Sequence, residues 1–342
     1  MTLAAASLDT GDTAWLLGGV SEVPHSTHDA RHAGMAGLGP DSVQGTVPTL
    51  LFATFQLTFA IITAALVGGA VADRAKFGAW LVFVPLWALL VYVPVAHWVW
   101  GPGGWILKDL GALDFAGGLP VEIVSGASGL ALCLVLGSRL GFKKDAMRPH
   151  NLPMVMLGAG LLRFGWFGFN AGSASGAVAG LVAITPSCGS VSLLGALVIG
   201  LAAGVVCSYA VGWKFRFGYD DSLDVVGVHL VGGVIGTLLI GVFATGTMTG
   251  GAEGLLYGGG LGQLGRQLVA ILTVGAYAFA VTYGVAELID RVVGLRADEE
   301  HEQTGLDLTV HAGTAYDHGV LGHGAPVSAS VLPTAQKARP QA

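Results

Sequence analysis

Long stretches without a charged residue set the strongest limit on the fold of this chain. They cover residues 42–72, 78–107, 123–138, 164–213, 225–252 and 267–286. Most of them are long enough for the roughly 20 apolar residues that a membrane-spanning helix needs. Only 11% of the 342 residues are charged and the mean hydropathy is +0.69, whereas soluble chains carry about 25% charge. The bilayer is therefore the expected solvent for most of the chain.

An all-α polytopic membrane protein is the predicted fold class. The apolar stretches show no alternation of period two, which argues against a transmembrane barrel. The 55 glycines favour close packing of helices inside a membrane. The acidic residues give a net charge of −6, and no basic face predicts a nucleic-acid partner.

Seven stretches are predicted to span the membrane, at 48–72, 78–100, 119–138, 152–172, 191–213, 225–246 and 267–289. An eighth apolar stretch, 174–187, is short for a span and is broken by Thr185-Pro186-Ser187-Cys188-Gly189. Its length favours a re-entrant or buried segment.

Basic residues predict the orientation, because short cytoplasmic loops collect lysine and arginine. Four clusters lie at residues 74–76, 139–148, 214–216 and 291–296. All four are cytoplasmic only if two spans separate each neighbouring pair, which is the count given above. We therefore expect a multi-pass inner-membrane protein with an extramembranous segment 1–47 outside, a transmembrane domain 48–290, and a cytoplasmic tail 291–342.

Few ionisable residues lie inside the expected spans, and such residues usually face a bundle interior or a pathway. They are Glu122, Arg163, His229 and, near an end, Glu287. The first and third follow similar phrases, Leu113-Asp114-x-x-Gly117 and Leu223-Asp224-x-x-Gly227. This weak repeat predicts an inverted-repeat transporter with a polar pair near the midplane. The alternative for His229 is a core histidine bonded to a helix carbonyl, and for Asp114 a helix N-cap, which is compatible with shaping a pore mouth.

Aromatic residues gather in three phrases: Phe55-Gln-Leu-Thr-Phe59, His97-Trp-Val-Trp100 and Gly165-Trp-Phe-Gly-Phe169. They suit an interfacial aromatic belt. They also suit a cation site, because ammonium is attracted to aromatic faces and the Ser173 hydroxyl could accept one N–H bond. Cys133, Cys188 and Cys207 have no metal-binding spacing and read as core residues, so no cofactor is predicted.

Several phrases together resemble the Amt/Mep/Rh ammonium transporter family, most closely its bacterial members. The most specific are Phe164-Gly-Trp-Phe-Gly-Phe-Asn-Ala-Gly-Ser173 and Asp224-Val-Val-Gly-Val-His229. Others are Ala72-Asp-Arg-Ala-Lys-Phe77, Tyr92-Val-Pro-Val-Ala-His-Trp-Val-Trp100, Ala112-Leu-Asp-Phe-Ala-Gly-Gly118, Arg148-Pro-His-Asn-Leu-Pro-Met154 and Gly294-Leu-Arg296. The resemblance covers roughly residues 48–316. It implies an inverted-repeat helix bundle, a homotrimer with one pore in each subunit, and transport of ammonium; no enzyme activity is expected.

The resemblance assigns roles to individual positions. It implies an outer ammonium site at Trp100, Phe59 and Ser173, with Asp114 shaping the mouth. It implies a pore gate of Phe55, Phe59, Phe169 and Trp166. It places the pore dyad at Glu122 and His229. In the tail, Arg296, Glu302, Asp307 and Tyr316 resemble a regulatory segment that meets PII-type signalling proteins, although a solvated charged tail remains the alternative.

Three departures from the family pattern stand out. Glu122 replaces the histidine usual at the first dyad position, as in some fungal members, which favours transport coupled to a proton or to charge. Arg163 replaces an aromatic residue, and it either pairs with Glu122 or obstructs the pore. The resemblance also implies that the bundle is truncated: the first two helices and one internal helix, between Ser173 and Ser175, are absent. A transport-impaired ammonium sensor or regulatory subunit is therefore the alternative function.

Overall fold

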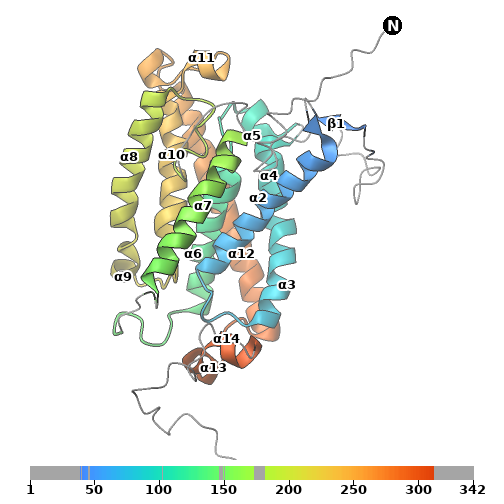
Figure 1. Ribbon diagram of the computed structural model, residues 1–342, viewed down its shortest axis with the longest axis vertical. Helices are drawn as coiled ribbons and strands as arrows, with labels where there is room; N and C mark the ends of the chain where they lie inside the picture. Colours follow the sequence, from blue (N-terminus) through green and yellow to red (C-terminus); the bar gives the residue numbers. More distant parts are fainter. Residues whose placement is uncertain are drawn as a thin grey trace, which may run out of the picture.

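The computed structural model is a bundle of long helices (Figure 1). It describes residues 39, 41–44, 47–101, 103–145, 149, 151–172 and 182–311. Seven of its helical segments are long and apolar enough to cross a membrane, which confirms the predicted number of spans. They run over Thr49–Gly69, Phe77–Lys108, Gly118–Leu136, Leu152–Asn170, Leu193–Phe217, Val226–Phe243 and Gly262–Val293. The bounds differ from the expected ones by a few residues at most ends, because apolar composition does not fix where a helix stops.

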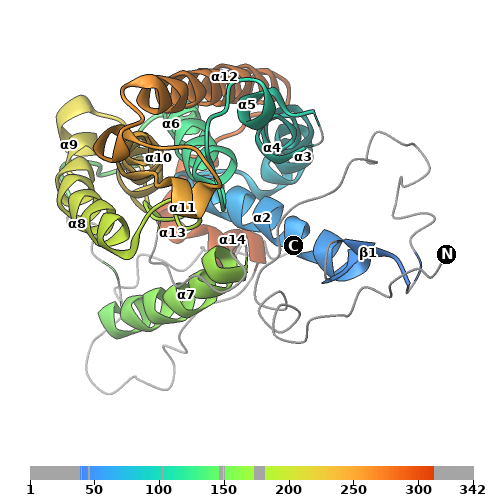
Figure 2. The ribbon, with the colours of Figure 1, turned by 90° about the horizontal axis from the view of Figure 1, so that it is seen from above.

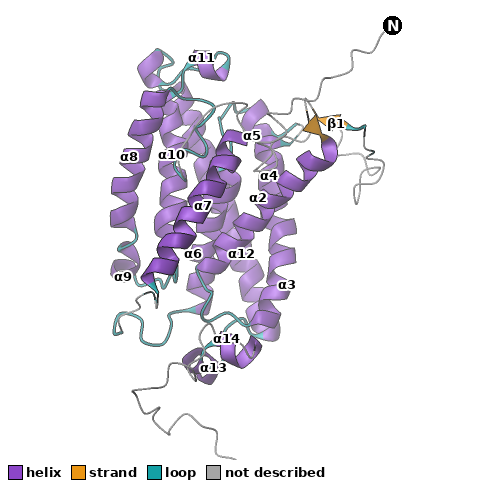
Figure 3. Ribbon diagram, viewed as in Figure 1, coloured by secondary structure: helices purple, strands orange, loops and turns teal. Residues whose placement is uncertain are grey.

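Helices make up most of the described structure (Figure 3). The spanning helices are α2 (Thr49–Gly69), α3 (Phe77–Trp87), α4 (Val93–Trp100), α6 (Val124–Leu136), α7 (Leu152–Gly172), α8 (Leu193–Ala210), α10 (Val231–Phe243) and α12 (Gly262–Val293). Three π-helical turns join or begin them: η2 (Ala88–Tyr92), η3 (Gly118–Ile123) and η4 (Val226–Leu230). Short elements lie at the two ends of the bundle: β1 (Val43–Gln44), β2 (Val47–Pro48), α5 (Trp105–Lys108), α9 (Trp213–Phe217), α11 (Gly246–Thr249), η5 (Leu255–Tyr257), α13 (Glu299–Thr304) and α14 (Leu306–His311).

The span formed by η3 and α6 is the centre of the bundle. Of its 18-residue apolar window, 83% is buried, against 11% for the span of α7. Helices α2 and α12 pack against α6, and α10 packs against η3. Seen along the bundle, α7 lies outside the group formed by the other long helices (Figure 2). The residues of η3 therefore lie at the centre of the bundle, and the span of α7 is the less buried side of it.

The predicted short segment 174–187 is only partly described. Residues 173–181 lie outside the described residues. The described remainder, 182–187, forms successive turns rather than a helix and is almost entirely buried. The sequence analysis expected a re-entrant or a buried segment here, and the described residues have the burial that both forms require.

A polar network closes the end of the bundle that carries α9, α13 and α14. The fully buried Arg74 donates to the carbonyl oxygens of Gly137, at 3.0 Å, and of Asp220. Arg139 donates to both carboxylate oxygens of Asp220, at 2.9 and 2.7 Å, and to Asp73 at 2.6 Å. Three loops that are far apart in the sequence are thereby fixed to one another, and with them the helices that hold the central residues.

Candidate functional site

The first π-helical turn, η3, begins at a buried carboxylate. Asp114 lies four residues before η3, and its Oδ1 accepts hydrogen bonds from the backbone N–H groups of Gly117 and Gly118, both at 2.9 Å. Its Oδ2 accepts from Leu119 N at 2.5 Å. These N–H groups have no partner inside the helix, so Asp114 caps the span that carries Glu122. Burial raises the pKa of Asp114 to about 6, although the three N–H groups lower it.

The second π-helical turn, η4, has a related but not identical start. In the weak sequence repeat, Asp224 corresponds to Asp114, which suggests that Asp224 caps η4. The backbone N–H of Val226 instead donates to Asp221 Oδ2 at 2.7 Å. Asp224 instead has a left-handed backbone, with φ of 61°, and its carboxylate lies 2.6 Å from the Lys214 ammonium. The cap of η4 is therefore three residues earlier than the repeat suggests, because the chain turns through the left-handed region before the helix starts.

Glu122 and His229 meet in the centre of the bundle, one on each π-helical turn. Glu122 Oε2 lies 2.6 Å from His229 Nδ1. The glutamate side chain is fully buried and the histidine side chain is 12% exposed. Within the described part of the chain, Glu122 Oε1 has no hydrogen-bond partner. The contact joins residues 107 positions apart, and π-helical turns of this kind occur frequently at functional sites.

Two glycines allow this contact, and each lies four residues after one member of the pair. A Cβ on Gly233 would lie 2.6 Å from Glu122 Cβ, and a Cβ on Gly126 would lie 2.4 Å from Leu230 Cβ, next to His229. Each glycine thus faces the opposite π-helical turn. The sequence analysis did not single out these glycines, although their equal spacing from the two ionisable residues was a usable signal.

A cluster of aromatic rings lies between the loop of Asp114 and the Glu122–His229 pair. The Phe59 centroid is 4.8 Å from those of Phe55 and Phe169 and 5.4 Å from that of Trp100, each in an edge-to-face arrangement. Trp166 lies 5.9 Å from Phe169 and 6.5 Å from the His229 ring. All the aromatic positions assigned from the sequence are therefore together, on α2, α4 and α7. Ser173, the remaining position of the expected outer site, lies outside the described residues.

A cavity of about 10 Å³ lies between these rings and Glu122. It is lined by Phe59, Ile62, Ala116, Val121, Glu122, Trp166, Phe169 and Thr185. This volume is about that needed by one water-sized molecule. Thr185 accepts a hydrogen bond from Trp166 Nε1 at 2.9 Å, which fixes the indole in the cavity wall. The buried turn segment thus contributes to the cavity, which the sequence alone did not indicate.

The loop of Asp114 is held in place from α12. Gln267 Oε1 accepts from Leu113 N, and Gln267 Nε2 donates to Leu113 O, both at 2.7 Å. Trp100 Nε1 donates to Asp114 O at 3.2 Å. The sequence analysis missed Gln267, although a fully buried amide in an apolar span was a signal for it.

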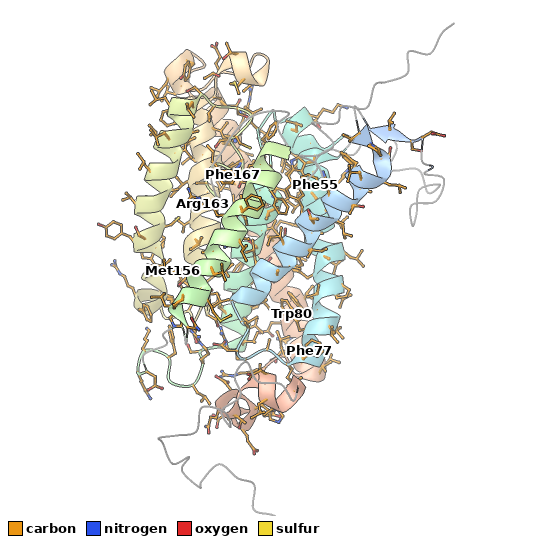
Figure 4. The ribbon with its side chains drawn as sticks, viewed as in Figure 1. Phe55, Phe77, Trp80, Met156, Arg163 and Phe167 are labelled. Carbon is orange, nitrogen blue, oxygen red and sulfur yellow. The ribbon has the colours of Figure 1, made fainter. Side chains whose placement is uncertain are left out.

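Arg163 is not paired with Glu122, contrary to one of the two expectations for it. Among the described residues Arg163 makes no ion pair. It lies midway along α7 (Figure 4) and lines a groove of about 800 Å³ between α7 and α8. The groove also reaches Trp166, Cys207 and His229. The side of the pair that faces α7 is therefore less enclosed than the side of Glu122.

The described part of the tail is fixed to the bundle. Arg296 donates to Glu302 Oε2 at 2.8 Å and to the carbonyl of Leu136 at 3.1 Å. Glu302 Oε1 accepts from Leu140 N at 2.8 Å. Asp307 is exposed on α14, and Tyr316 lies outside the described residues. Arg296 and Glu302 therefore anchor the tail at the end of α6, and the expected contact with a signalling protein remains a prediction.

The sequence matches that of known proteins over most of its length. The sequence model of the Ammonium Transporter Family matches residues 27–177 and 174–316. An ammonium transporter of Mycobacterium tuberculosis is 48% identical in an alignment 344 residues long. The alignment covers 84% of this chain and 71% of the relative. An ammonium transporter of Bacillus subtilis is 44% identical, over 83% of this chain and 80% of the relative.

Solved structures show the same fold. Candida albicans Mep2 has a TM-score of 0.72 at 29% identity, covering 87% of this chain and 78% of that one. Saccharomyces cerevisiae Mep2 has a TM-score of 0.69 at 29% identity, covering 87% and 86%. A structure described as a sensor Amt protein has a TM-score of 0.68 at 24% identity, a similarity of fold alone.

Proposed function

Because the chain belongs to the Ammonium Transporter Family, and is therefore a multi-pass membrane transporter rather than an enzyme, we propose that it moves ammonium nitrogen past its aromatic cluster to the Glu122–His229 pair. The observation that carries this proposal is the small cavity between the rings and Glu122, which has room for one small molecule. One wall is aromatic and the floor is a buried carboxylate. A small cation that can also donate hydrogen bonds suits both surfaces.

Recruitment is the first step of the proposed mechanism. Trp100 and Phe59 present ring faces and edges at the outer side of the cluster, and the Asp114 carboxylate holds the loop around them. An ammonium ion loses part of its hydration here, and the aromatic rings offset that loss by cation–π attraction. We place the Ser173 hydroxyl at the same site as an acceptor for one N–H group.

Passage through the rings is the second step. Phe59 and Phe169 lie edge to face at 4.8 Å, and Phe55 stacks on Phe169 at 6.0 Å. Rings at these separations leave no open path between mouth and cavity, so a ring must rotate before a molecule enters. Rotamer changes of this kind are fast, and a closed gate excludes water and larger ions.

Charge handling at Glu122 and His229 is the third step. Glu122 Oε2 is occupied by His229, and Oε1, which has no partner among the described residues, is the acceptor that an entering N–H group would meet. The carboxylate and the imidazole, 2.6 Å apart, form one hydrogen-bonded unit. We propose that this unit takes the proton of ammonium, or holds the cation itself, so that charge crosses with nitrogen.

The basic residues at the two ends of the bundle support a proposal for its orientation in the membrane. Basic residues gather at the end of the bundle with α9 and α13: Arg74, Lys76, Arg139, Lys143, Lys144, Lys214, Arg216, Arg291 and Arg296. The other end has Lys108 and Arg266. We therefore place the α9 end in the cytoplasm and the extramembranous segment 1–47 outside. We also propose a homotrimer in the inner membrane, whose tail, anchored through Arg296 and Glu302, is available to a PII-type protein.

The experiment compares Glu122→Gln with the matched control Glu287→Gln in reconstituted liposomes. Glu287 lies near the end of α12 and is bonded to Arg291, away from the cavity. Ammonium jumps on a solid-supported membrane should give a current in the wild type and in Glu287→Gln, and a much smaller one in Glu122→Gln. Equal currents in all three proteins would remove the Glu122–His229 pair from the mechanism.

A transport-impaired ammonium sensor or regulatory subunit is the second candidate. The groove beside Arg163 and His229, as the described residues form it, favours it, because the His229 side of the pair is less enclosed than the Glu122 side. The same assay separates the two functions. Saturable ammonium binding without current in the wild type would support the sensor, and a current would exclude it.

A further inference from the structure

The short helix α9 alternates aromatic and basic residues, and it lies at the end of the span that begins with α8. Its sequence is Trp213-Lys-Phe-Arg-Phe217. The loop 137–145 lies beside it, because the rings of Phe142 and Phe215 stack at 5.8 Å with an interplanar angle of 15°. We call the surface formed by these two segments the α9 surface. It consists of Phe142, Lys143, Lys144, Trp213, Phe215, Arg216 and Phe217.

The aromatic side chains of the α9 surface are uncovered. Phe217 is 68% exposed, Phe215 is 54% exposed and Trp213 is 39% exposed. In water this would leave a group of large apolar side chains without contacts. At the boundary between hydrocarbon and headgroups, however, aromatic residues are favoured at this depth, where the spanning segment ends at Phe217. Their exposure therefore indicates contact with lipid rather than with solvent.

The basic side chains of the α9 surface are also exposed. Lys143, Lys144 and Arg216 are exposed, and within the described part of the chain they make no ion pair, although the exposed Asp145 lies in the same loop. Other basic residues at this end differ. Lys214 is paired with Asp224, and Arg139 is paired with Asp73 and Asp220.

Two of these cations, those of Lys143 and Arg216, lie over aromatic rings. Lys143 adopts a left-handed backbone with φ of 66°, which is uncommon outside glycine. Its ammonium lies 5.7 Å from the Phe142 centroid and 3.6 Å from the place of a Cβ on Gly218 at the end of α9. The Arg216 guanidinium lies 5.7 Å from the Phe217 centroid. These two positive groups are thus placed next to aromatic rings of the same surface.

We propose that the α9 surface binds the headgroups of anionic phospholipids. Its rings would lie at the base of the headgroup layer, and Lys143, Lys144 and Arg216 would contact lipid phosphates. Lysine and arginine form strong charge-assisted hydrogen bonds with phosphate, and basic residues beside a span attract anionic lipids. A soluble anion would explain the cations but would leave the exposed rings unexplained.

Trp213 provides the assay, because it belongs to the surface and lies 6.5 Å from Phe217. Its fluorescence is obtained as the difference between the wild type and Trp213→Phe, each in liposomes with brominated phosphatidylglycerol or brominated phosphatidylcholine at equal mole fraction. We expect stronger quenching by phosphatidylglycerol at low salt. Each basic residue near an anionic surface is worth about a fivefold preference, so Arg216→Gln should reduce the preference by about that factor.

Arg291→Gln is the matched control. It removes the same charge at the same end of the bundle, but Arg291 is already paired with Glu287 at 2.6 Å. It should leave the preference unchanged. Equal quenching by the two lipids in the wild type, or an equal loss in Arg291→Gln, would overturn the proposal. Suppression of the preference by soluble glycerol phosphate at millimolar concentration would also overturn it, and would indicate a site for free anions.

Discussion

Replacing Gly233 by alanine tests whether close packing of two helices holds the Glu122–His229 pair together. The new Cβ would lie 2.6 Å from Glu122 Cβ and 3.2 Å from the Gly118 carbonyl oxygen. Atoms on or next to the backbone cannot move away cheaply, so η3 and α10 must separate. We expect Gly233→Ala to lengthen the contact between Glu122 and His229 and to lower ammonium transport.

The magnitude follows from comparison with a second alanine substitution. Gly284 on α12 has open space where its Cβ would lie. Both variants gain the same helix propensity, up to about 1 kcal/mol, so this gain cancels in the comparison. Overpacking of a well-packed interior costs about 1–3 kcal/mol, which for a chain of this length should appear as a melting temperature about 1–4 °C lower in Gly233→Ala than in Gly284→Ala.

Thermal unfolding of the purified protein in detergent, followed by circular dichroism, measures this difference. Gly126→Ala provides an independent repeat, because its Cβ would lie 2.5 Å from Leu230 N on the other side of the crossing. If Gly233→Ala and Gly284→Ala unfold at the same temperature and transport equally well, the glycines do not set the separation of the two helices.

Three further predictions concern buried polar groups outside the pair. Gln267→Leu should lower the free energy of unfolding by about 1–3 kcal/mol for each backbone group of Leu113 left without a partner, and calorimetry should show a smaller loss in Gln263→Leu, which removes bonds to Gly111, Gln267 and Arg266 but none to Leu113. The apparent affinity for ammonium should rise as pH increases through about 6, because the Asp114 carboxyl, whose pKa burial raises to about 6, then gains its negative charge; in Asp114→Asn uptake assays should give a flatter profile. Burial opposes ionisation of Asp220, but its bonds to Arg139 outweigh this and lower its pKa. The stability that this carboxylate contributes is therefore present above the ordinary pKa of about 4 and lost as pH falls through the lowered value, so acid titration of unfolding should be less steep in Asp220→Asn.

The sequence by itself determined the spans and the chemistry available in them. Length and apolar composition are local properties, and a bilayer requires every spanning backbone to be helical, so seven helices could be located without any knowledge of contacts. The rarity of ionisable residues in hydrocarbon likewise singled out Glu122 and His229. The phrases around Trp100, Phe169 and His229 carried the family resemblance, and the comparisons confirm the family.

Only the tertiary structure decided which faces of the helices meet. In a soluble protein the apolar stripe of a helix marks its buried side, but a helix in a bilayer is apolar all round, so its sequence does not show which side faces lipid. The side of α7 that carries Arg163 was unpredictable for this reason, and the residue lines a groove instead of reaching Glu122. The cap of η4 by Asp221 depends on a left-handed residue that the sequence repeat did not reveal. The contact of Gln267 with the loop of Asp114 joins positions 154 residues apart, and such contacts exist only once the helices are packed.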